Sequence, residues 1–249
     1  MTDTRHIVAS HYDGVPALRQ TLASARAGLD YAAAYSEDHP LVTVRIATYD
    51  RAEILFDRTL PSVLDQTYPH LEIIIVGDGA SEETARRARL VTDERVRFVN
   101  LPHRGVYPED PHKRWLVAGS PAMNHGAQLA RGRWIAPLDD DDTFTPDHVE
   151  RLLTLAREGR FEMVYGQMDV VRDPPEQHLV IGTYPPAYSQ FGFQSALYVS
   201  ALRFFEYDTA SWVLDEPGDW NLCRRMLAAG VLIGYTPHVV TTLYPAGPR

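Results

Sequence analysis

The sequence predicts an α/β protein with one large domain, in which helices cover both faces of a mainly parallel central sheet. Residues 41–142 alternate short apolar runs with helical patterns, as stacked strand-helix units do. The run at residues 72–76 (EIIIV) is almost continuously apolar, which is typical of a strand covered on both faces. With 249 residues, 45% hydrophobic and 23% charged, the chain can bury a sizeable core.

The first part of this half predicts three strands and two helices. Strands are expected at 41–47, 72–76 and 96–101, and helices at 52–66 and 81–91. After the third strand, residues 102–120 contain prolines, charges and Trp115 without a clear period. We expect a long loop there, and long loops in compact domains are usually functional or mobile.

A helix at 121–131, stopped by Gly132, leads into a fourth strand at 134–138. Thr145 as N-cap and Pro146 at the first helical position predict a helix that continues to Gly159. The remaining elements are strands at 163–171 and 179–183 around a turn at 173–175, a helix at 219–229 closed by Gly230, and strands at 231–236 and 239–243. Residues 1–40 are expected to form a helical appendage with one helix at 16–35.

Charge and composition exclude several classes of protein. The chain has 24 Lys and Arg against 33 Asp and Glu, a net charge of −9, and no lysine-arginine run, which opposes nucleic-acid binding. Its apolar stretches fall far short of the roughly 20 residues that span a bilayer. Residues 1–30 lack a signal-peptide pattern, and the single Cys223 cannot form an internal disulfide. A cytoplasmic protein without a transmembrane segment is expected.

Residues 139–142 are four consecutive aspartates, placed directly after the predicted fourth strand. Neighbouring carboxylates at about 4 Å repel by roughly 1 kcal/mol even in water, so the cluster favours a cation. Oxygen ligands suit Mg²⁺ or Mn²⁺. One alternative is a solvated acidic turn before the helix near Pro146. Another is an EF-hand calcium loop, which Phe144 at the required glycine position opposes.

Two other strand ends are expected at the same crevice, because open α/β sheets bind ligands beyond the carboxyl ends of their strands. Residues 48–51 follow the first strand, and residues 77–79 follow the second. There the glycines let the backbone approach a ligand, and Asp78 can accept hydrogen bonds. The alternatives are an ordinary Asp-Gly turn and a helix cap at Thr48.

An ordered set of motifs resembles the family 2 glycosyltransferases of the GT-A fold, among them the spore-coat nucleotide-diphospho-sugar transferases. The motifs are residues 45–51 (RIATYDR), 64–69 (LDQTYP), 75–79 (IVGDG), 123–126 (MNHG), 134–142 (WIAPLDDDD) and 214–222 (LDEPGDWNL). The match covers roughly residues 41–243. It implies a nucleotide-sugar-binding half at 41–142 and an acceptor-binding half at 143–249 of one GT-A domain.

The resemblance also implies roles for single residues on the donor side. Thr48 and Tyr49 would line the nucleobase pocket, and Asp78 would bond the base, with uracil and thymine equally suited. Asn124 would contribute to the donor site. Asp140 would lie near the ribose or the diphosphate.

Metal and acid-base roles follow in the same way. Asp139 to Asp141 match the DxD-type element, in which Asp141 would be the main ligand of Mn²⁺ or Mg²⁺ and Asp139 a second one. Asp219 matches the family's catalytic base. A sugar hydroxyl needs such a base because it is a poor nucleophile at neutral pH. The alternative for Asp219 is a carboxylate that only stabilises a helix N-terminus.

The sequence departs from the family pattern at several positions. Gly77 replaces a common Asp, Asp50 a common Asn, and Gly218 a common Glu. The Arg that often precedes the family's Asn is missing, since Ala122 and Met123 stand before Asn124. Lys113 or Arg114 in the predicted loop could take over its contact with the donor phosphates.

These observations favour an inverting glycosyltransferase that uses a UDP- or dTDP-type sugar donor, a divalent metal and a carbohydrate or other hydroxyl acceptor. A sugar-phosphate nucleotidyltransferase is one alternative, but its Gly-rich phosphate loop near the first strand is absent. A non-catalytic module that binds nucleotide or metal is another, supported by Gly218 and the missing Arg. The sequence leaves open whether the chain forms a homo-oligomer.

Overall fold

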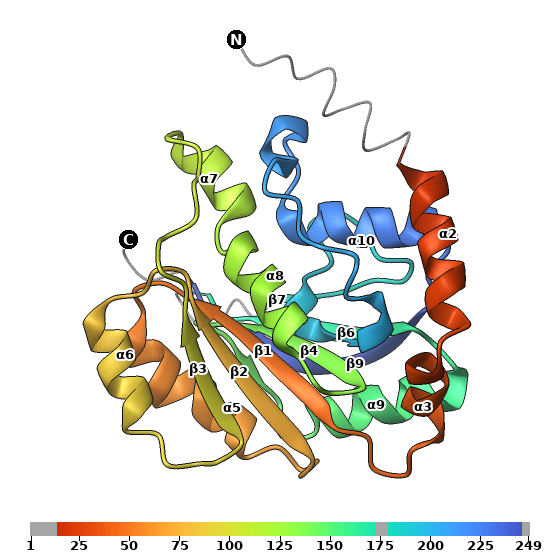
Figure 1. Ribbon diagram of the computed structural model, residues 1–249, viewed down its shortest axis with the longest axis horizontal. Helices are drawn as coiled ribbons and strands as arrows, with labels where there is room; N and C mark the ends of the chain where they lie inside the picture. The colour runs from red at the N-terminus through yellow and green to blue at the C-terminus, as the bar shows by residue number, and fades with distance from the viewer. Residues whose placement is uncertain (1–13, 173–178, 246–249) are drawn as a thin grey trace.

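The computed structural model describes residues 14–172 and 179–245 (Figure 1). The strands are β1 (Val42–Thr48), β2 (Leu71–Gly77), β3 (Val96–Asn100), β4 (Trp134–Asp139), β5 (Thr143–Phe144), β6 (Met163–Val170), β7 (Leu179–Ile181), β8 (Ala196–Val199) and β9 (Ile233–Leu243). The α-helices are α2 (Val15–Arg26), α3 (Leu29–Ser36), α4 (Ala52–Ile54), α5 (Leu60–Leu64), α6 (Glu82–Arg89), α7 (Pro111–Val117), α8 (Ser120–Leu129), α9 (His148–Gly159) and α10 (Gly218–Ala229). A π-helical stretch η1 (Leu55–Thr59) joins α4 to α5, and short 3₁₀ helices are η2 (Phe193–Ser195), η3 (Ser200–Leu202) and η4 (Ser211–Leu214).

In the described residues the strands form one sheet in the order β3-β2-β1-β4-β8-β6-β9-β5, with β7 paired to β6. β1 lies parallel between β2 and β4, and its last residues pair with the last residues of both, Thr48 with Gly77 and Ala47 with Asp139. The carboxyl ends of three strands therefore meet at one edge, as the sequence predicts. β8 runs antiparallel to β4 and β6, whereas β6 and β9 are parallel.

Alternate residues of β1 explain why helices cover both faces of the sheet. Val42, Val44 and Ile46 are buried in one core cluster with apolar residues of η1 and α5. Arg45 points to the other face, where its side chain runs close to Gly126 of α8. Figure 1 shows α5 and α8 on opposite sides of these strands, so the expected layered α/β arrangement is confirmed.

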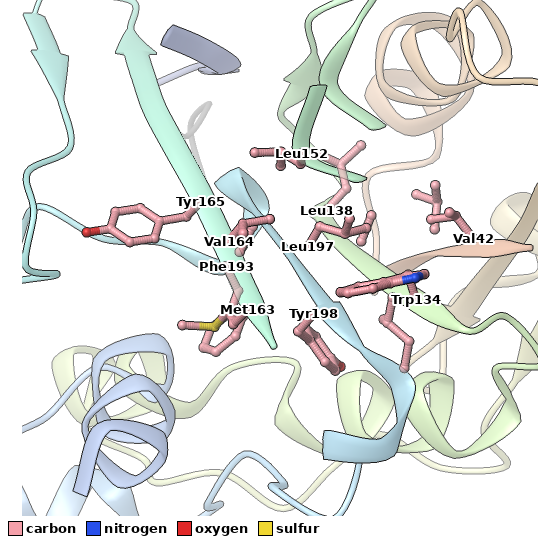
Figure 2. Close-up of a cluster of buried hydrophobic side chains, with 14 of the residues drawn as sticks. Val42, Trp134, Leu138, Leu152, Met163, Val164, Tyr165, Phe193, Leu197 and Tyr198 are labelled. Carbon is pink, nitrogen blue, oxygen red and sulfur yellow. The ribbon is translucent and has the colours of Figure 1, made fainter. Parts of the chain in front are cut away.

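The main core lies between β4, β6, β8 and α9, as Figure 2 shows. Trp134, Tyr165 and Phe193 are among its largest fully buried side chains. Burial of a side chain of this size contributes roughly 1.5–3 kcal/mol. The indole N–H of Trp134 donates to the carbonyl of Ala34 at 3.1 Å, which ties the sheet to α3.

The helix expected at 16–35 is two helices, because the chain turns to an extended conformation at Gly28 (φ −76°, ψ 151°). Leu22 of α2 and Ala34 of α3 are buried in the main core. Arg26 donates to both carboxylate oxygens of the buried Glu162, at 2.6 and 2.8 Å. Both helices are thus packed and hydrogen-bonded to the sheet.

The prediction that residues 102–120 form only a loop is wrong, because α7 occupies Pro111–Val117. The Asp110 side chain accepts from the N–H of Lys113 at 2.9 Å, and Pro111 takes the first helical position. This is the Asp-Pro signal of a helix start, in a segment with too few apolar residues to show a period.

Two further boundaries differ from the prediction. The helix expected to begin with Thr145 as N-cap begins at His148, because the N–H of Thr145 bonds to Val240 of β9 and keeps that segment extended. The two strands expected at 231–236 and 239–243 are one strand, β9, which pairs with β6 along both halves. Residues 236–238 bulge opposite Gly166, where a proline is tolerated.

The other predicted elements of the second half are present, whereas β5, β8 and the 3₁₀ helices were not predicted. β6 and β7 are antiparallel neighbours, while the turn expected at 173–175 lies outside the described residues. α10 ends at Gly230, whose φ of 91° requires the left-handed conformation that glycine adopts readily. In the described part of the chain no helix is long and apolar enough to cross a bilayer.

Candidate active site

The structure brings the predicted strand-end residues together. The Thr48 hydroxyl donates to Asp140 Oδ2 at 2.7 Å, linking the ends of β1 and β4. The N–H of Asp78 donates to the Thr48 carbonyl at 2.7 Å, linking the ends of β1 and β2. These bonds fix three strand ends side by side at the sheet edge, where α/β folds bind ligands.

The four aspartates after β4 differ in accessibility. Asp140 and Asp142 are buried, and Asp142 accepts from the N–H of Tyr244 at 3.0 Å. Asp139 and Asp141 keep partial contact with solvent. The two aspartates that the sequence assigns to the metal are thus the two of the four that keep some exposed surface.

Two arginines neutralise this cluster, and the sequence analysis gave neither a role. Arg51 Nη1 contacts Asp140 Oδ1 at 3.1 Å and also donates to Asp141 Oδ2. Arg58 donates to the main-chain carbonyl of Asp141 at 2.6 Å and stacks on the ring of Tyr244 at 3.8 Å. An arginine directly after a strand end, as Arg51 is, was the available signal.

Burial and mutual repulsion shift the pKa values of these carboxylates upward. Burial raises the pKa of Asp139 well above its usual range, and the negative charges of Asp219 and Asp142 raise it further. Burial, followed by the charge of Asp141, raises the pKa of Asp142 to about 7. A cation bound beside these carboxylates would offset their mutual repulsion and favour their ionised forms.

Asp219 lies in the first turn of α10, and its charge acts on Asp139. Its Oδ2 accepts the N–H of Phe193 at 3.0 Å, and the Tyr207 hydroxyl also bonds its carboxylate. Burial raises the pKa of Asp219, although the group keeps some contact with solvent. A Cβ at Gly218 would lie 3.1 Å from the Tyr207 ring, so this ring fills the space where the family's common Glu would begin.

Arg45 is a buried cation behind this pair that sequence reasoning missed. Its Nη2 lies 3.5 Å from the Tyr207 hydroxyl, and its Nε has no hydrogen-bond partner in the described part of the chain. A Cβ at Gly126 would lie 2.6 Å from Arg45 Cγ, so this glycine lets the side chain pass beneath α8. A charge within the otherwise apolar strand was the signal for a buried partner.

Asn124 does not reach the strand ends directly. Its side chain donates to the Tyr207 carbonyl at 2.9 Å and accepts the Tyr207 N–H at 2.8 Å. The main-chain N–H and C=O of Tyr207 are thereby both fixed. In this arrangement Asn124 acts on the site by holding Tyr207 beside Asp219.

Asp78 and Tyr49 contact the segment before α7. Asp78 accepts the N–H of Gly105 at 2.9 Å through Oδ1 and the Tyr107 hydroxyl through Oδ2. The Tyr49 ring is exposed and lies 3.7 Å below the guanidinium of Arg104. Gly105, Tyr107 and Arg104 therefore contact the two side chains that the sequence assigns to the nucleobase.

The substitution at Gly77 has a structural counterpart in Asn100. A Cβ at Gly77 would lie 2.3 Å from Asn100 Oδ1, so the carboxamide occupies the place of a larger side chain. Asn100 accepts the N–H of Ala80 and donates to its carbonyl, both at 2.9 Å. Asn100, the last residue of β3, thus holds the turn that follows β2.

The two cations proposed to replace the missing Arg both lie exposed on α7. Arg114 donates to the carbonyls of Pro108 and Glu109 at 3.1 and 2.7 Å. Lys113 Nζ lies 5.3 Å from the centroid of the Trp212 ring. The Arg114 side chain therefore binds the segment that precedes α7. The Lys113 side chain instead contacts the ring of Trp212.

A divalent metal fits the site only as a shared ion. Within residues 14–172 and 179–245, no three His, Cys, Asp or Glu side chains are placed to hold a metal by themselves. The partly exposed Asp139 and Asp141 offer two carboxylates, which is the number with which Mg²⁺ is often bound when substrate phosphates supply further oxygens. The donor set thus suits a metal that binds together with a diphosphate.

Two known proteins are each similar to part of this chain. A succinoglycan biosynthesis protein, ExoO, of Rhizobium meliloti is 32% identical over 53% of this chain and 34% of its own length. A chondroitin synthase of Escherichia coli is 31% identical over 71% of this chain and 24% of its own length. The chain thus spans only about a third and a quarter of these relatives.

A solved structure supports the fold. The crystal structure of residues 1–349 of TarS from S. aureus, in complex with UDP-GlcNAc, superposes with a TM-score of 0.65 over 84% of this chain and 60% of that one, at 12% identity. The profile of glycosyl transferase family 2 matches residues 43–108 and 112–202, which is more than half of the sequence and includes β1, the aspartate cluster and Asn124. With its GT-A-like fold, the chain belongs to glycosyl transferase family 2.

Proposed function

We propose that this protein transfers a sugar from a nucleotide-diphosphate donor to an acceptor hydroxyl with inversion, using a divalent metal and an aspartate base. One observation carries the proposal. The partly exposed Asp139 and Asp141 follow the end of β4, and Asp219 lies near enough for its charge to raise the pKa of Asp139. This proximity supports a metal side and a base side in one site.

On the donor side, Thr48, Tyr49 and Asp78 are assigned to the nucleobase, and Asp140 to the ribose or diphosphate. Asp78 already accepts two hydrogen bonds, but a carboxylate has about four lone-pair sites and can accept another from a uracil or thymine N–H. UDP- and dTDP-sugars are therefore the expected donors. The UDP-GlcNAc bound to TarS is consistent with this class.

Asp141 and Asp139 would hold Mn²⁺ or Mg²⁺ together with the donor phosphates. When bound, such an ion supplies positive charge to the leaving diphosphate. Arg58 holds the main-chain carbonyl of Asp141, the main ligand. Asn124 contributes indirectly, through the Tyr207 backbone.

Asp219 is assigned as the base that takes the acceptor proton. Its raised pKa makes the Asp219 carboxylate a stronger base than an ordinary Asp. The Phe193 N–H and the Tyr207 hydroxyl fix the direction of its carboxylate. A single displacement with the base on the face opposite the leaving group gives inversion.

The experiment is calorimetric titration of UDP and dTDP with and without Mn²⁺, on the wild type and on Asp141→Asn. We expect metal-dependent nucleotide binding that the substitution abolishes. The free energy of unfolding of the metal-free variant should stay level or rise, since one repelling charge is gone. Unchanged Mn²⁺ dependence in the variant would show that Asp141 is not the metal ligand.

Donor hydrolysis decides between an enzyme and a module that only binds nucleotide. An enzyme releases sugar slowly from a matching donor, and faster with Mn²⁺ than without. Binding without any release across UDP- and dTDP-sugars, also with candidate acceptors added, would favour the non-catalytic module. Gly218 and the missing Arg keep that alternative in view.

A further inference from the structure

Arg51 occupies a cation position within the aspartate cluster. A single nitrogen, Nη1, bridges two carboxylates, Asp140 Oδ1 at 3.1 Å and Asp141 Oδ2. All three side chains are largely shielded, with 29% of Arg51, 10% of Asp140 and 14% of Asp141 exposed. Charge-assisted contacts of this kind are strong where water is scarce.

The two carboxylates are held differently. The Asp140 side chain has a second anchor in the Thr48 hydroxyl, and the Thr59 hydroxyl donates to its main-chain carbonyl at 3.0 Å. Asp141 is anchored through its main-chain carbonyl by Arg58. Asp140 is therefore fixed in place, whereas the Asp141 carboxylate depends on Arg51.

We propose that Arg51 is the resident cation of Asp141 and competes with the divalent metal for this carboxylate. The inference rests on the proposed function, which makes Asp141 the main metal ligand. A metal and a guanidinium on one carboxylate repel each other, so the metal must displace Arg51 from Asp141. Arg51 can then stay on Asp140 Oδ1, whose position does not depend on the metal.

This competition also gives an order to binding. In the free protein Arg51 compensates Asp141, so the metal alone gains little by entering. Donor phosphates supply additional oxygens to the metal and shift the balance toward displacement. Metal should therefore bind weakly by itself and much more tightly with the nucleotide diphosphate.

The test measures Mn²⁺ affinity, with and without UDP, from the electron paramagnetic resonance signal of free Mn²⁺. Arg51→Met removes the competitor. Arg58→Met is the matched control, because it removes the same charge from the same neighbourhood but contacts the Asp141 carbonyl, not its carboxylate. We expect Arg51→Met to bind Mn²⁺ at least about tenfold more tightly than the wild type, and Arg58→Met within about threefold.

Arg51→Gln serves as a second variant in case Arg51→Met does not fold. Glutamine keeps a hydrogen-bond donor for Asp140 and removes only the charge, so it should raise Mn²⁺ affinity in the same direction. Urea unfolding of all variants, without metal, identifies those with an intact fold.

Several outcomes would overturn the inference. If the wild type binds Mn²⁺ with UDP and the Arg51 variants bind it no more tightly, Arg51 is not a competitor, and the proposed function stands. An equal gain in Arg58→Met would mean that general electrostatics causes the effect. If no form binds Mn²⁺ even with UDP, the metal in the proposed function fails, and this inference fails with it.

Discussion

Replacing Arg26 by Met should strongly destabilise the protein, because it leaves a buried carboxylate without its cation. The Glu162 side chain has no exposed surface, and Arg26 gives it two hydrogen bonds, at 2.6 and 2.8 Å. Breaking a buried ion pair from one side typically costs 3–5 kcal/mol. Arg26 is 36% exposed, and Glu162 keeps donors in the Tyr31 hydroxyl and the Leu232 N–H, so we expect about 2–3 kcal/mol.

The effect should depend on pH. Burial alone would raise the pKa of Glu162, but hydrogen bonds from Arg26, the Leu232 N–H and Tyr31 hold it below its usual value. A lowered folded-state pKa stabilises the fold above the ordinary pKa of about 4.5, and this contribution disappears as the pH falls through the folded value. The difference between wild type and Arg26→Met should therefore be largest near pH 7 and shrink below pH 4.

Urea unfolding followed by circular dichroism at pH 7 and pH 4 measures this difference. Arg19→Met is the matched control, since Arg19 lies on the same helix but bonds only the Ala228 carbonyl, at 3.2 and 3.0 Å. We expect it to cost about 1 kcal/mol or less. In the Arg26→Met background, Glu162→Gln should recover stability at pH 7. A loss below about 1 kcal/mol in Arg26→Met, or one that grows toward low pH, would refute the reasoning.

Three further predictions concern the candidate active site. Asp219→Asn should keep donor affinity near wild type in calorimetry while lowering the rate of transfer 10²- to 10⁴-fold, whereas a merely helix-capping role predicts a loss of less than about threefold. Asn124→Ala should cost about 1–2 kcal/mol in urea unfolding and lower kcat more than it raises the donor KM, because it frees the Tyr207 backbone beside Asp219; an unchanged kcat would place its role elsewhere. Hydrogen exchange of residues 102–120 should slow when UDP and Mn²⁺ are added, since this segment contacts Asp78; equal exchange in both states would leave it an ordinary surface segment.

The strand-helix units of residues 41–142 could be predicted from apolar patterns in the sequence. β1, β2 and β4 are short, mainly apolar runs, and parallel pairing then places Thr48, Gly77 and Asp139 at one edge. β8 could not be predicted in this way, because a four-residue strand is specified by its partners β4 and β6 and not by a period of its own.

The contacts behind the site, among Arg45, Tyr207 and Asn124, join residues far apart in the sequence. Arg45 and Tyr207 are 162 residues apart in the sequence, and Asn124 contacts Tyr207 across 83. Only the folded backbone brings them to Asp219. The motif around Asn124 could therefore be recognised, but its action through Tyr207 could not be inferred without the structure.

The packing of α2 affects how the chain folds as it is synthesised. Arg26 finds Glu162 across 136 residues, and Arg19 finds Ala228 across 209. A helix of 12 residues is marginal alone in water, so α2 leaves the ribosome early but gains its stabilising contacts only when β6 and α10 have followed. During that interval its apolar face is open to chaperones or to other nascent chains. Closure of these long sequence separations is thus postponed until β6 and α10 have been made, which predicts late acquisition of protease resistance in α2 and α3.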